Sequence, residues 1–421
     1  MVAMDSNTLI PHLFRNEYSK IVAVLVKRFG LDQIEIAEDL ASETFLTATQ
    51  TWGIGGVPDN PTAWLYQVAK NKAINYLKRE ARFNTKITMD LKSPPPDPDE
   101  PSIDLSEKNI HDSVLQMMFV VCHPSISAEA QISLSLRVLC GFGIDEIAAA
   151  FLVTKETINK RLFRAKEKWR EEGIRIELPG GSHIESRLEN VLTTLYLLFN
   201  EGYYSVSQNK TIRKDLCLEA IRLCSLLIEN KNTNQPAVDA LMSLMCFHIS
   251  RFDARTDKNG ELILYEDQDI ALWNMNWIHK GGYFLHQASR GEKISKYHLE
   301  AGIAYWHTQK NDDHEKWEAI LQLYNQLLLL EYSPVAALNR TYALFRAKGP
   351  EGMFLAIKEA EKLNLTDNQF YFILLGELYS GIDPVSAKNN YLKALSLCRT
   401  SADKQAIKKK VDKLDAEIPG R

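Results

Sequence analysis

Apolar residues recur at steps of three and four positions along almost the whole chain. Leu192, Leu195, Tyr196 and Phe199 are one example. This spacing places apolar side chains on one face of an α-helix, whereas a half-buried β-strand alternates apolar and polar residues at every second position. Alternating runs are nearly absent from the sequence. The pattern therefore predicts an all-α protein.

Two interruptions divide the helical pattern. The first is a proline-rich run that starts at Ser93 and continues to Glu107 with five acidic side chains and no basic one. Because such a segment buries little apolar surface, we expect an extended acidic linker over residues 91–110. The second is Leu178-Pro-Gly-Gly-Ser182, after which a new helical period begins. We therefore predict small helical domains at residues 1–90 and 111–178, and a helical extension over residues 183–421.

A repeat is visible in the last part of the chain. The similar strings YNQLLLL, IKEAEKL and YLKALSL begin at Tyr324, Ile357 and Tyr391, at steps of 33 and 34 residues. This is the period of the tetratricopeptide (TPR) helix pair. Gly349 and Gly381 lie where the turn inside each pair should fall. We predict a TPR-like array from about residue 297, with chance similarity in a leucine-rich helical segment as the alternative.

The bulk composition limits the classes of function. The 421 residues are 45% hydrophobic, which is enough for two or three folded domains and argues against a disordered chain. The formal net charge is −4, so any contact with nucleic acid must come from local basic patches. P-loop, dinucleotide-binding, zinc-protease and nucleophile-elbow strings do not occur, which argues against an enzyme.

Cysteine usage and apolar runs indicate the compartment. Six cysteines are scattered singly, without the Cys or His spacing that holds zinc, so we expect buried reduced thiols, no metal site and no cofactor. The first residues lack a signal-peptide pattern, and about 18 consecutive apolar residues occur nowhere. We expect a soluble cytoplasmic protein that does not contact membranes.

Residues 141–165 have the pattern of two short helices joined by a tight turn. The first helix can begin after Gly143, with Glu146 placed to bond back to the cap. Thr154 is the predicted cap of the second helix, whose buried stripe consists of Ile158, Leu162 and Ala165. This stripe leaves the polar residues between Lys155 and Arg164 facing outward, as in a recognition helix that reads a DNA major groove.

The second of these helices is basic although the whole chain is acidic. From Lys155 to Arg175, eight basic side chains stand against four glutamates. A local basic surface binds DNA by neutralising phosphates and releasing their counterions. The alternative interpretation is an ordinary helical hairpin with a solvated basic face.

Two N-terminal helices carry opposite charge. Residues 61–83 begin with a proline at a plausible first helical position, and six basic side chains lie between Lys70 and Lys86 against one glutamate. Residues 35–52 form an amphipathic helix with a predicted acidic outer face, made of Glu35, Glu38, Asp39 and Glu43. The contrast suggests two partners of opposite charge.

Amides and an aromatic residue accompany the basic run. Asn71, Lys72, Asn75 and Tyr76 can hydrogen-bond to unpaired bases and stack on them. The alternative is a set of surface residues beside a core tyrosine.

Three strings in this order resemble the extracytoplasmic-function (ECF) sigma factors of the sigma-70 family. Residues 39–45 read Asp-Leu-Ala-Ser-Glu-Thr-Phe, similar to the helix of the family that binds core polymerase. Residues 61–71, together with Asn75, Lys78 and Arg79, resemble its promoter-melting helix, and residues 146–148 with 157–165 resemble its downstream helix-turn-helix. Ser42 and Asn75 stand where Gln and Asp are commoner in the family.

The resemblance implies a sigma factor that directs promoter-specific transcription initiation, with core RNA polymerase and promoter DNA as partners and no catalytic residues. The implied polymerase-binding residues are Asp39, Leu40 and Glu43. The implied −10 residues are Asn71, Lys72, Asn75, Lys78 and Arg79. The implied −35 residues are Lys155, Glu156, Thr157, Asn159, Lys160, Arg161 and Arg164.

The extension resembles that of long ECF sigma factors with a C-terminal TPR-like domain, in strings such as residues 198–203 and Asp267-Gln268-Asp269. The resemblance implies a regulatory domain that binds a protein, a peptide or another part of the same chain. The charged segment from Arg251 to Asp269 is either a ligand or docking site or a salt-bridged connection between helices.

Two rival functions remain at this stage. An enzyme is disfavoured by the missing motifs. A TPR scaffold with a DNA-binding head would account for residues 141–421, but not for the melting-type string between Pro61 and Arg79.

Overall fold

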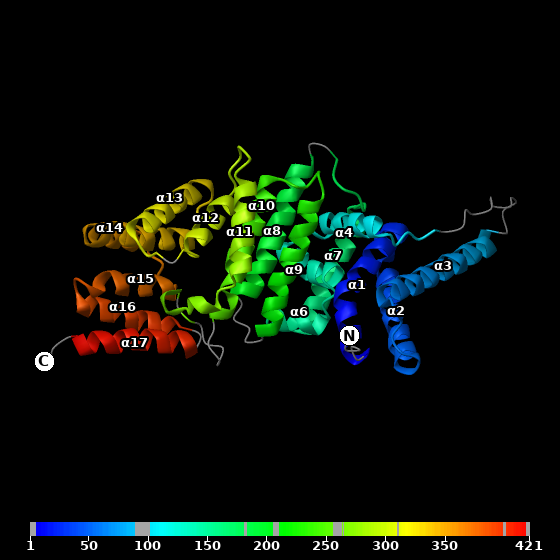
Figure 1. The fold of residues 1–421 in the computed structure, drawn as a ribbon, viewed down its shortest axis with the longest axis horizontal. Helices are drawn as coiled ribbons and strands as arrows, with labels where there is room; N and C mark the ends of the chain where they lie inside the picture. Colours follow the sequence, from blue (N-terminus) through cyan, green and yellow to red (C-terminus); the bar gives the residue numbers. More distant parts are fainter. Residues whose placement is uncertain are drawn as a thin grey trace. The chain divides into compact units, whose positions relative to one another are not determined.

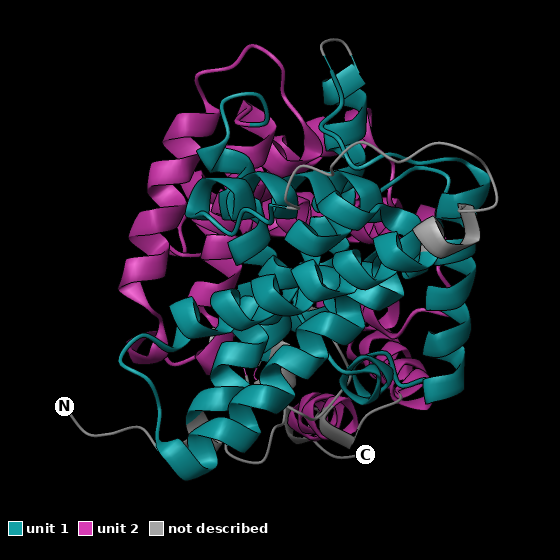
Figure 2. Ribbon diagram, turned by 90° about the vertical axis from the view of Figure 1, so that its right-hand side faces the viewer, with its two compact units in different colours: residues 1–233 teal, residues 234–421 magenta. Residues whose placement is uncertain are grey.

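The computed structural model describes residues 6–88, 102–180, 183–204, 210–255, 263, 265–309, 311–398 and 401–417. The chain divides into two compact units, residues 1–233 and residues 234–421, which are coloured separately in Figure 2. Every regular element in the described ranges is helical, and none of them is a strand. The all-α prediction is confirmed.

The first unit begins with three helices, α1 (Ser6–Phe29), α2 (Ile34–Gly55) and α3 (Pro61–Thr88), labelled in Figure 1. Both predicted N-terminal helices are present, and Pro61 is the first residue of α3, where its missing N–H costs nothing. The three helices pack against one another through fully buried side chains such as Tyr18, Leu25 and Leu65.

Five further helical elements follow a gap in the described residues. They are α4 (Glu107–Val121), α5 (Ala128–Leu134), the π-helical turn η2 (Ser135–Leu139), α6 (Ile144–Ala150) and α7 (Lys155–Glu171). Residues 89–101, which include most of the predicted acidic linker, lie outside the described residues. Ser106 caps α4 by accepting a hydrogen bond from the backbone N–H of Asn109.

The first unit is completed by α8 (His183–Tyr204) and α9 (Lys210–Glu229), which pack on each other and on the preceding helices. The guanidinium of Arg187 donates to the carbonyl of Phe119 at 2.7 Å, and that of Arg222 donates to the carbonyl of Leu139 at 2.7 Å. The buried hydroxyl of Thr194 donates to Oε1 of Gln131 at 2.7 Å. The start of the C-terminal extension is therefore an integral part of the first unit.

The second unit consists of consecutive helices. The longer ones are α10 (Pro236–Ser250), α11 (Met275–Ala288), α12 (Lys296–Trp306), α13 (His314–Leu330), α14 (Pro334–Leu363), α15 (Gln369–Ser380), α16 (Pro384–Leu397) and α17 (Ser401–Glu417). From α12 onward each helix packs on the next in the chain.

The repeated strings occupy equivalent positions in this array. Leu327, Ala360 and Ala394 are all buried. Gly349 has φ 56° and ψ −145°, which breaks α14 into two helices, and Gly381 follows the last residue of α15. Both glycines thus lie at the turns that the sequence predicts. The assignment of the array to the TPR class stays a prediction.

All six cysteines are free and buried, as the sequence predicts. No helix in the described part of the chain is long and apolar enough to cross a membrane. The described residues also contain no group of three or more His, Cys, Asp or Glu side chains arranged to hold a metal ion.

Candidate functional site

Helix α2 presents acidic side chains on the surface of the first unit. Asp39 and Glu43 are exposed, and Leu40 is half-buried. The opposite face of the helix buries Ala41 and Phe45. Oε2 of Glu43 lies 3.3 Å from Nζ of Lys72, so α2 and α3 are joined by an ion pair between two candidate residues.

Helix α3 gathers the predicted −10 residues on one side. Asn71, Asn75, Lys78 and Arg79 are exposed, and their spacing of three, four and seven or eight residues places them on one helical face. Leu65, Ala69 and Ala73 fill the opposite face, which is buried. The amide of Gln67 donates to Oδ1 of Asn71 at 2.9 Å. The result is a continuous polar and basic strip that can contact a nucleic-acid strand.

Tyr76 lies beside this strip, but its side chain packs within the first unit. Its ring centre is 5.5 Å from that of Phe29, and its hydroxyl is 3.5 Å from Oε1 of Gln33. This agrees with the alternative interpretation of a packing tyrosine.

Helices α6 and α7 form the predicted hairpin. The carboxylate of Glu146 accepts a hydrogen bond from the backbone N–H of Gly143 at 2.8 Å. The hydroxyl of Thr154 accepts from the N–H of Thr157 and caps α7. The buried stripe of α7 consists of Ile158, Leu162, Ala165 and Trp169. Both expected caps and the expected stripe are therefore present.

The outward face of α7 carries the predicted −35 residues. Lys155, Glu156, Asn159, Lys160 and Arg164 are exposed, whereas Thr157 and Arg161 are half-buried. Nζ of Lys155 lies 2.7 Å from Oδ1 of Asp145, but both side chains keep more than half of their surface in water. Such an exposed pair stabilises little and can exchange for a phosphate contact.

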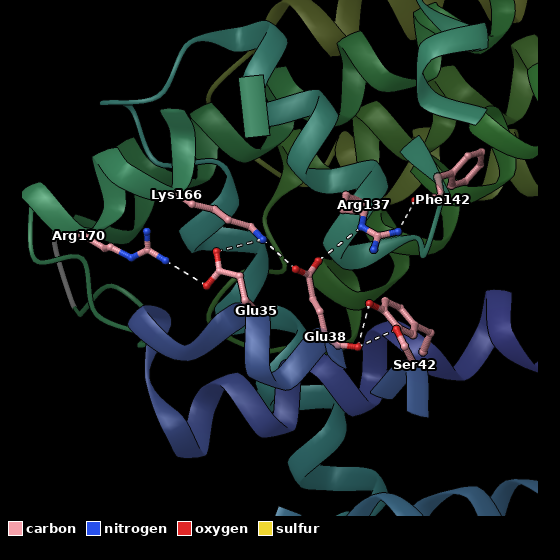
Figure 3. A network of polar contacts seen from close by, with 8 residues as sticks. Glu35, Glu38, Ser42, Arg137, Phe142, Lys166 and Arg170 are labelled. Carbon is pink, nitrogen blue, oxygen red and sulfur yellow. Dashed lines mark hydrogen bonds and ion pairs between the residues drawn. The ribbon is translucent and has the colours of Figure 1, made fainter. Parts of the chain in front are cut away.

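A second set of charges on α7 faces α2, as Figure 3 shows. Nζ of Lys166 lies 2.7 Å from Oε2 of Glu38 and 3.6 Å from Oε1 of Glu35. Nη2 of Arg170 lies 3.0 Å from Oε2 of Glu35. Nε of Arg137, on η2, lies 3.5 Å from Oε1 of Glu38. The two acids of α2 are thus held by three basic side chains from the downstream helices.

Glu38 corrects one expectation from the sequence. The sequence predicts it on the outer face of α2 with Glu35, Asp39 and Glu43, but it is buried. The side chains of Glu38 and Lys166 each keep 12% of their exposure. Glu38 precedes Ala41 by three residues and Phe45 by seven, so helical spacing places it on their face of α2. The spacing cannot show that α7, from far along the chain, covers Glu38.

Hydroxyls from α1 and α2 contact the backbone of Glu38, and α1 also pairs with α6. The hydroxyl of Tyr18 and that of Ser42 lie 3.5 Å and 2.8 Å from the carbonyl oxygen of Glu38. Burial, together with the nearby Glu38, raises the pKa of Tyr18 to about 12, so this hydroxyl stays protonated. Nη2 of Arg15 lies 2.8 Å from Oε1 of Glu146, and its guanidinium stacks 4.0 Å from the ring centre of Phe142.

Three residues of this network carry no signal that sequence reasoning used. The sequence shows Lys166 and Arg170 only as part of the basic stretch of α7, and it gives no local signal for Arg137. Lys166 and Arg170 lie seven and eleven residues after Asn159, so they share its face of α7 farther along the helix, and periodicity alone does not distinguish them from the proposed −35 residues.

The charged segment that begins at Arg251 lies in the second unit. Arg251 is 7% exposed, and its Cζ lies 5.4 Å and 5.9 Å from the ring centres of Tyr265 and Trp273. Nζ of Lys316, 2% exposed, donates to the hydroxyl of Tyr265 at 3.1 Å. Within the described residues, neither cation pairs with a carboxylate. Residues 256–262 and 264 of this segment lie outside the described residues.

Comparison with known proteins adds evidence from sequence similarity. Residues 13–83 match the family model of sigma-70 region 2, and residues 187–289 match a family of unknown function (DUF6596). The uncharacterized protein R00370 of Rhizobium meliloti (strain 1021) is 33% identical over 390 residues, which cover 91% of this chain and 91% of that protein. No solved structure matches the chain.

The region 2 match coincides with the first part of the site. It covers most of α1, all of α2 and most of α3, and therefore the acidic surface of α2 and the polar strip of α3. It supports the role of a sigma-70 factor, which acts in promoter-directed transcription initiation without being an enzyme. It also implies core RNA polymerase and promoter DNA as the partners.

Proposed function

The chain belongs to the family of the uncharacterized protein R00370 of Rhizobium meliloti, and because it also carries sigma-70 region 2, we propose that it is an ECF-type sigma factor. It binds core RNA polymerase through Asp39, Leu40 and Glu43 on α2. It contacts the −10 element through the exposed strip of α3. The hairpin of α6 and α7 acts as a helix-turn-helix on the −35 element, and the whole protein acts in the cytoplasm.

One observation carries this proposal. The region 2 match covers α2 and most of α3. The exposed face of α2 is acidic, and the exposed face of α3 is basic and carries amides. An acidic face is repelled by DNA and fits a basic protein surface, whereas a basic face with amides fits a nucleic-acid strand.

Helix α7 supports the −35 assignment by its chemistry. Asn159 and Arg164 are exposed on a helix whose buried stripe fixes its orientation, and such side chains read adenine and guanine in a major groove. Lys155 and Lys160 are exposed near the N-terminal end of α7, and we expect them to contact phosphates of the same element.

The second unit is proposed as a regulatory, TPR-like domain. Consecutive packed helices with a period of 33–34 residues build an elongated surface that binds a peptide or helix. A protein partner or another segment of this chain is the expected ligand.

Reconstituted transcription tests the proposal. The purified chain and core polymerase should give run-off transcripts from defined promoters, and core alone should not. The double variant Asp39→Lys/Glu43→Lys should lose co-purification with core polymerase, because two attractive charges become repulsive.

The matched control carries the same charge change on α8. The variant Glu185→Lys/Glu189→Lys alters two exposed acids outside the region 2 match and should bind core polymerase as the wild type does. The proposal is wrong if the chain confers no promoter-specific starts, and the α2 assignment is wrong if both double variants bind core equally well.

A further inference from the structure

Two cations of the second unit are buried side chains without an acidic partner. Arg251, which follows α10, is 7% exposed, and Lys316, in the first turn of α13, is 2% exposed. Cζ of Arg251 and Nζ of Lys316 each lie 5.4 Å from the centre of the Tyr265 ring. Taking a charge out of water costs free energy unless an opposite charge or several hydrogen bonds compensate it. Within the described residues, the opposite charge is missing for both cations.

Arg251 is the less compensated of the two cations. Nζ of Lys316 donates to the hydroxyl of Tyr265 at 3.1 Å and to the carbonyl of Gln309 at 3.2 Å. Nε of Arg251 is buried without a hydrogen-bond partner, and the described residues accept no hydrogen bond from the rest of its guanidinium. The ring faces of Tyr265 and Trp273 attract this cation, but they do not replace in-plane acceptors for its N–H groups. The planar fork of Arg251 is therefore available to an acceptor.

Two further nitrogens beside Tyr265 lack partners. Nε1 of Trp273 and Nδ1 of His307 are both buried without a hydrogen bond. The ring centres of His307 and Trp273 lie 5.0 Å and 6.3 Å from that of Tyr265. An indole nitrogen can only donate, so Trp273 has the same need of an acceptor as Arg251. One anion at this place would satisfy both.

The charges that act on the cluster leave it positive. Burial, and then Arg251 and Lys316, lower the pKa of His307 to about 3, so this imidazole is neutral at pH 7. Asp312 opposes the effect of the two cations on His307, but its carboxylate is already paired with Arg346. Asp312 therefore compensates a different cation, and the charges of Arg251 and Lys316 remain.

We propose that the second unit binds a small free carboxylate at this cluster, which consists of Arg251, Tyr265, Trp273, His307 and Lys316. The fork of Arg251 holds the two carboxylate oxygens, Lys316 adds a second positive charge, and Nε1 of Trp273 donates a further hydrogen bond. The inference concerns the second unit alone and does not depend on the proposed role in transcription.

Two arguments narrow the class of ligand. A singly charged carboxylate fits better than a phosphate dianion, because the cost of taking an ion out of water rises steeply with its charge. Arg251 and Lys316 are both more than nine-tenths buried, so a small molecule can reach them more easily than a carboxylate that is attached to a peptide.

Calorimetric titration of the full-length chain with sodium acetate tests the site. Acetate presents a carboxylate with little further surface, and the wild type should bind it saturably when sodium chloride keeps the ionic strength constant. Sodium phosphate should bind more weakly than acetate. Acetyl-trialanine, whose carboxylate belongs to a peptide, should also bind more weakly.

Substitutions of Arg251 separate binding from a structural role. Arg251→Lys keeps the charge but removes the fork, and it should weaken acetate binding at least about tenfold, the factor that one lost charge-assisted hydrogen bond is worth. Arg251→Met should abolish binding. Without acetate, Arg251→Met should melt no lower than the wild type, because a buried charge without a partner is removed and methionine also packs well against aromatic rings. An arginine with only a structural role would instead lower the melting temperature when it is replaced.

Lys293→Met provides the matched control. It removes one positive charge from an exposed position of the same unit and should bind acetate as the wild type does.

Each outcome decides part of the inference. The site is overturned if the wild type does not bind acetate, or if Arg251→Lys binds it as tightly as the wild type. The comparison with Arg251→Lys decides this even if Arg251→Met does not fold. Tighter binding of phosphate than of acetate would overturn the assignment to a carboxylate, and tighter binding of acetyl-trialanine would show that the ligand is a peptide and not a free small molecule.

Discussion

Glu38 and Lys166 are 128 residues apart in the sequence, yet their carboxylate and ammonium groups lie 2.7 Å apart. The pair joins a helix inside the region 2 match to the helix proposed to read the −35 element. Both side chains are nearly buried, so without its partner Glu38 would keep only the longer contact to Arg137 at 3.5 Å, and Lys166 only the contact to Glu35 at 3.6 Å. The stability of α2 and that of α7 are therefore coupled within the first unit.

A double-mutant cycle should measure this coupling. Lys166→Met keeps the length of the side chain but leaves Glu38 with only the longer contact to Arg137, and we expect a loss of roughly 2 kcal/mol in the free energy of unfolding. Adding Glu38→Gln should recover part of that loss, because the buried charge is removed. Urea denaturation measures both values. Strict additivity of the two single losses would contradict the coupling, and Lys168→Met should cost less than about 0.5 kcal/mol.

The sequence predicted the elements well and the contact between α2 and α7 poorly. Local signals decided the successes: Pro61 begins α3, Thr154 caps α7, and Gly349 and Gly381 mark turns. The burial of Glu38 depends on a partner far along the chain, and periodicity within one helix cannot reveal such a partner. The same limit applies to α8, whose packing on α4 and α5 requires knowledge of the tertiary structure.

Substitutions on α3 and α7 should separate base contacts from phosphate contacts. Asn159→Ala should change the preferred −35 sequence, with a loss of roughly 1–3 kcal/mol at one base pair if its amide reads an adenine. Lys160→Ala should instead weaken all promoters alike and reduce the salt slope of binding by about one. Arg79→Ala should behave like Lys160→Ala on the −10 side. Binding to randomised promoter libraries at several salt concentrations measures both properties.

Uniform weakening by Asn159→Ala would show that this residue does not read bases. Lys168→Ala provides the control on α7, because Lys168 is half-buried and pairs with Glu171 and Glu172 of its own helix.

His307 should make the second unit sensitive to acid. Burial, and then the cations of Arg251 and Lys316, lower the pKa of this imidazole from 6.5 to about 3. The unfolded chain therefore binds the proton more tightly, and the stabilisation that is present above pH 6.5 is lost progressively as the pH falls toward 3. Each unit of difference corresponds to about 1.4 kcal/mol.

Thermal unfolding of the full chain between pH 7 and pH 4 measures the effect. His307→Gln should reduce the pH dependence of the transition that belongs to the second unit, and the part that remains should come from His248, whose pKa burial also lowers. His279→Gln, at an exposed position on α11, should leave it unchanged. A wild-type transition that does not move between pH 7 and pH 4 would contradict the lowered pKa.

The position of a truncation should decide whether the first unit survives. A chain that ends at Leu178 loses α8 and α9, and with them the buried Leu188, Val191 and Leu195. It also leaves the amide of Gln131 without the hydroxyl of Thr194, and the carbonyls of Phe119 and Leu139 without their arginines. Each buried polar group left unpaired costs about 1–3 kcal/mol.

We therefore expect the chain that ends at Leu178 to melt at a much lower temperature or to aggregate, because the apolar surface under α8 becomes exposed. A chain that ends at Thr233 keeps the complete first unit and should remain monomeric with one cooperative transition. Size-exclusion chromatography and calorimetry compare the two. Only the longer fragment is then suitable for testing whether the second unit changes transcription. We expect its promoter-dependent transcription to differ several-fold from that of the full chain. Equal melting temperatures for the two fragments would mean that α8 and α9 contribute no stability to the helices on which they pack.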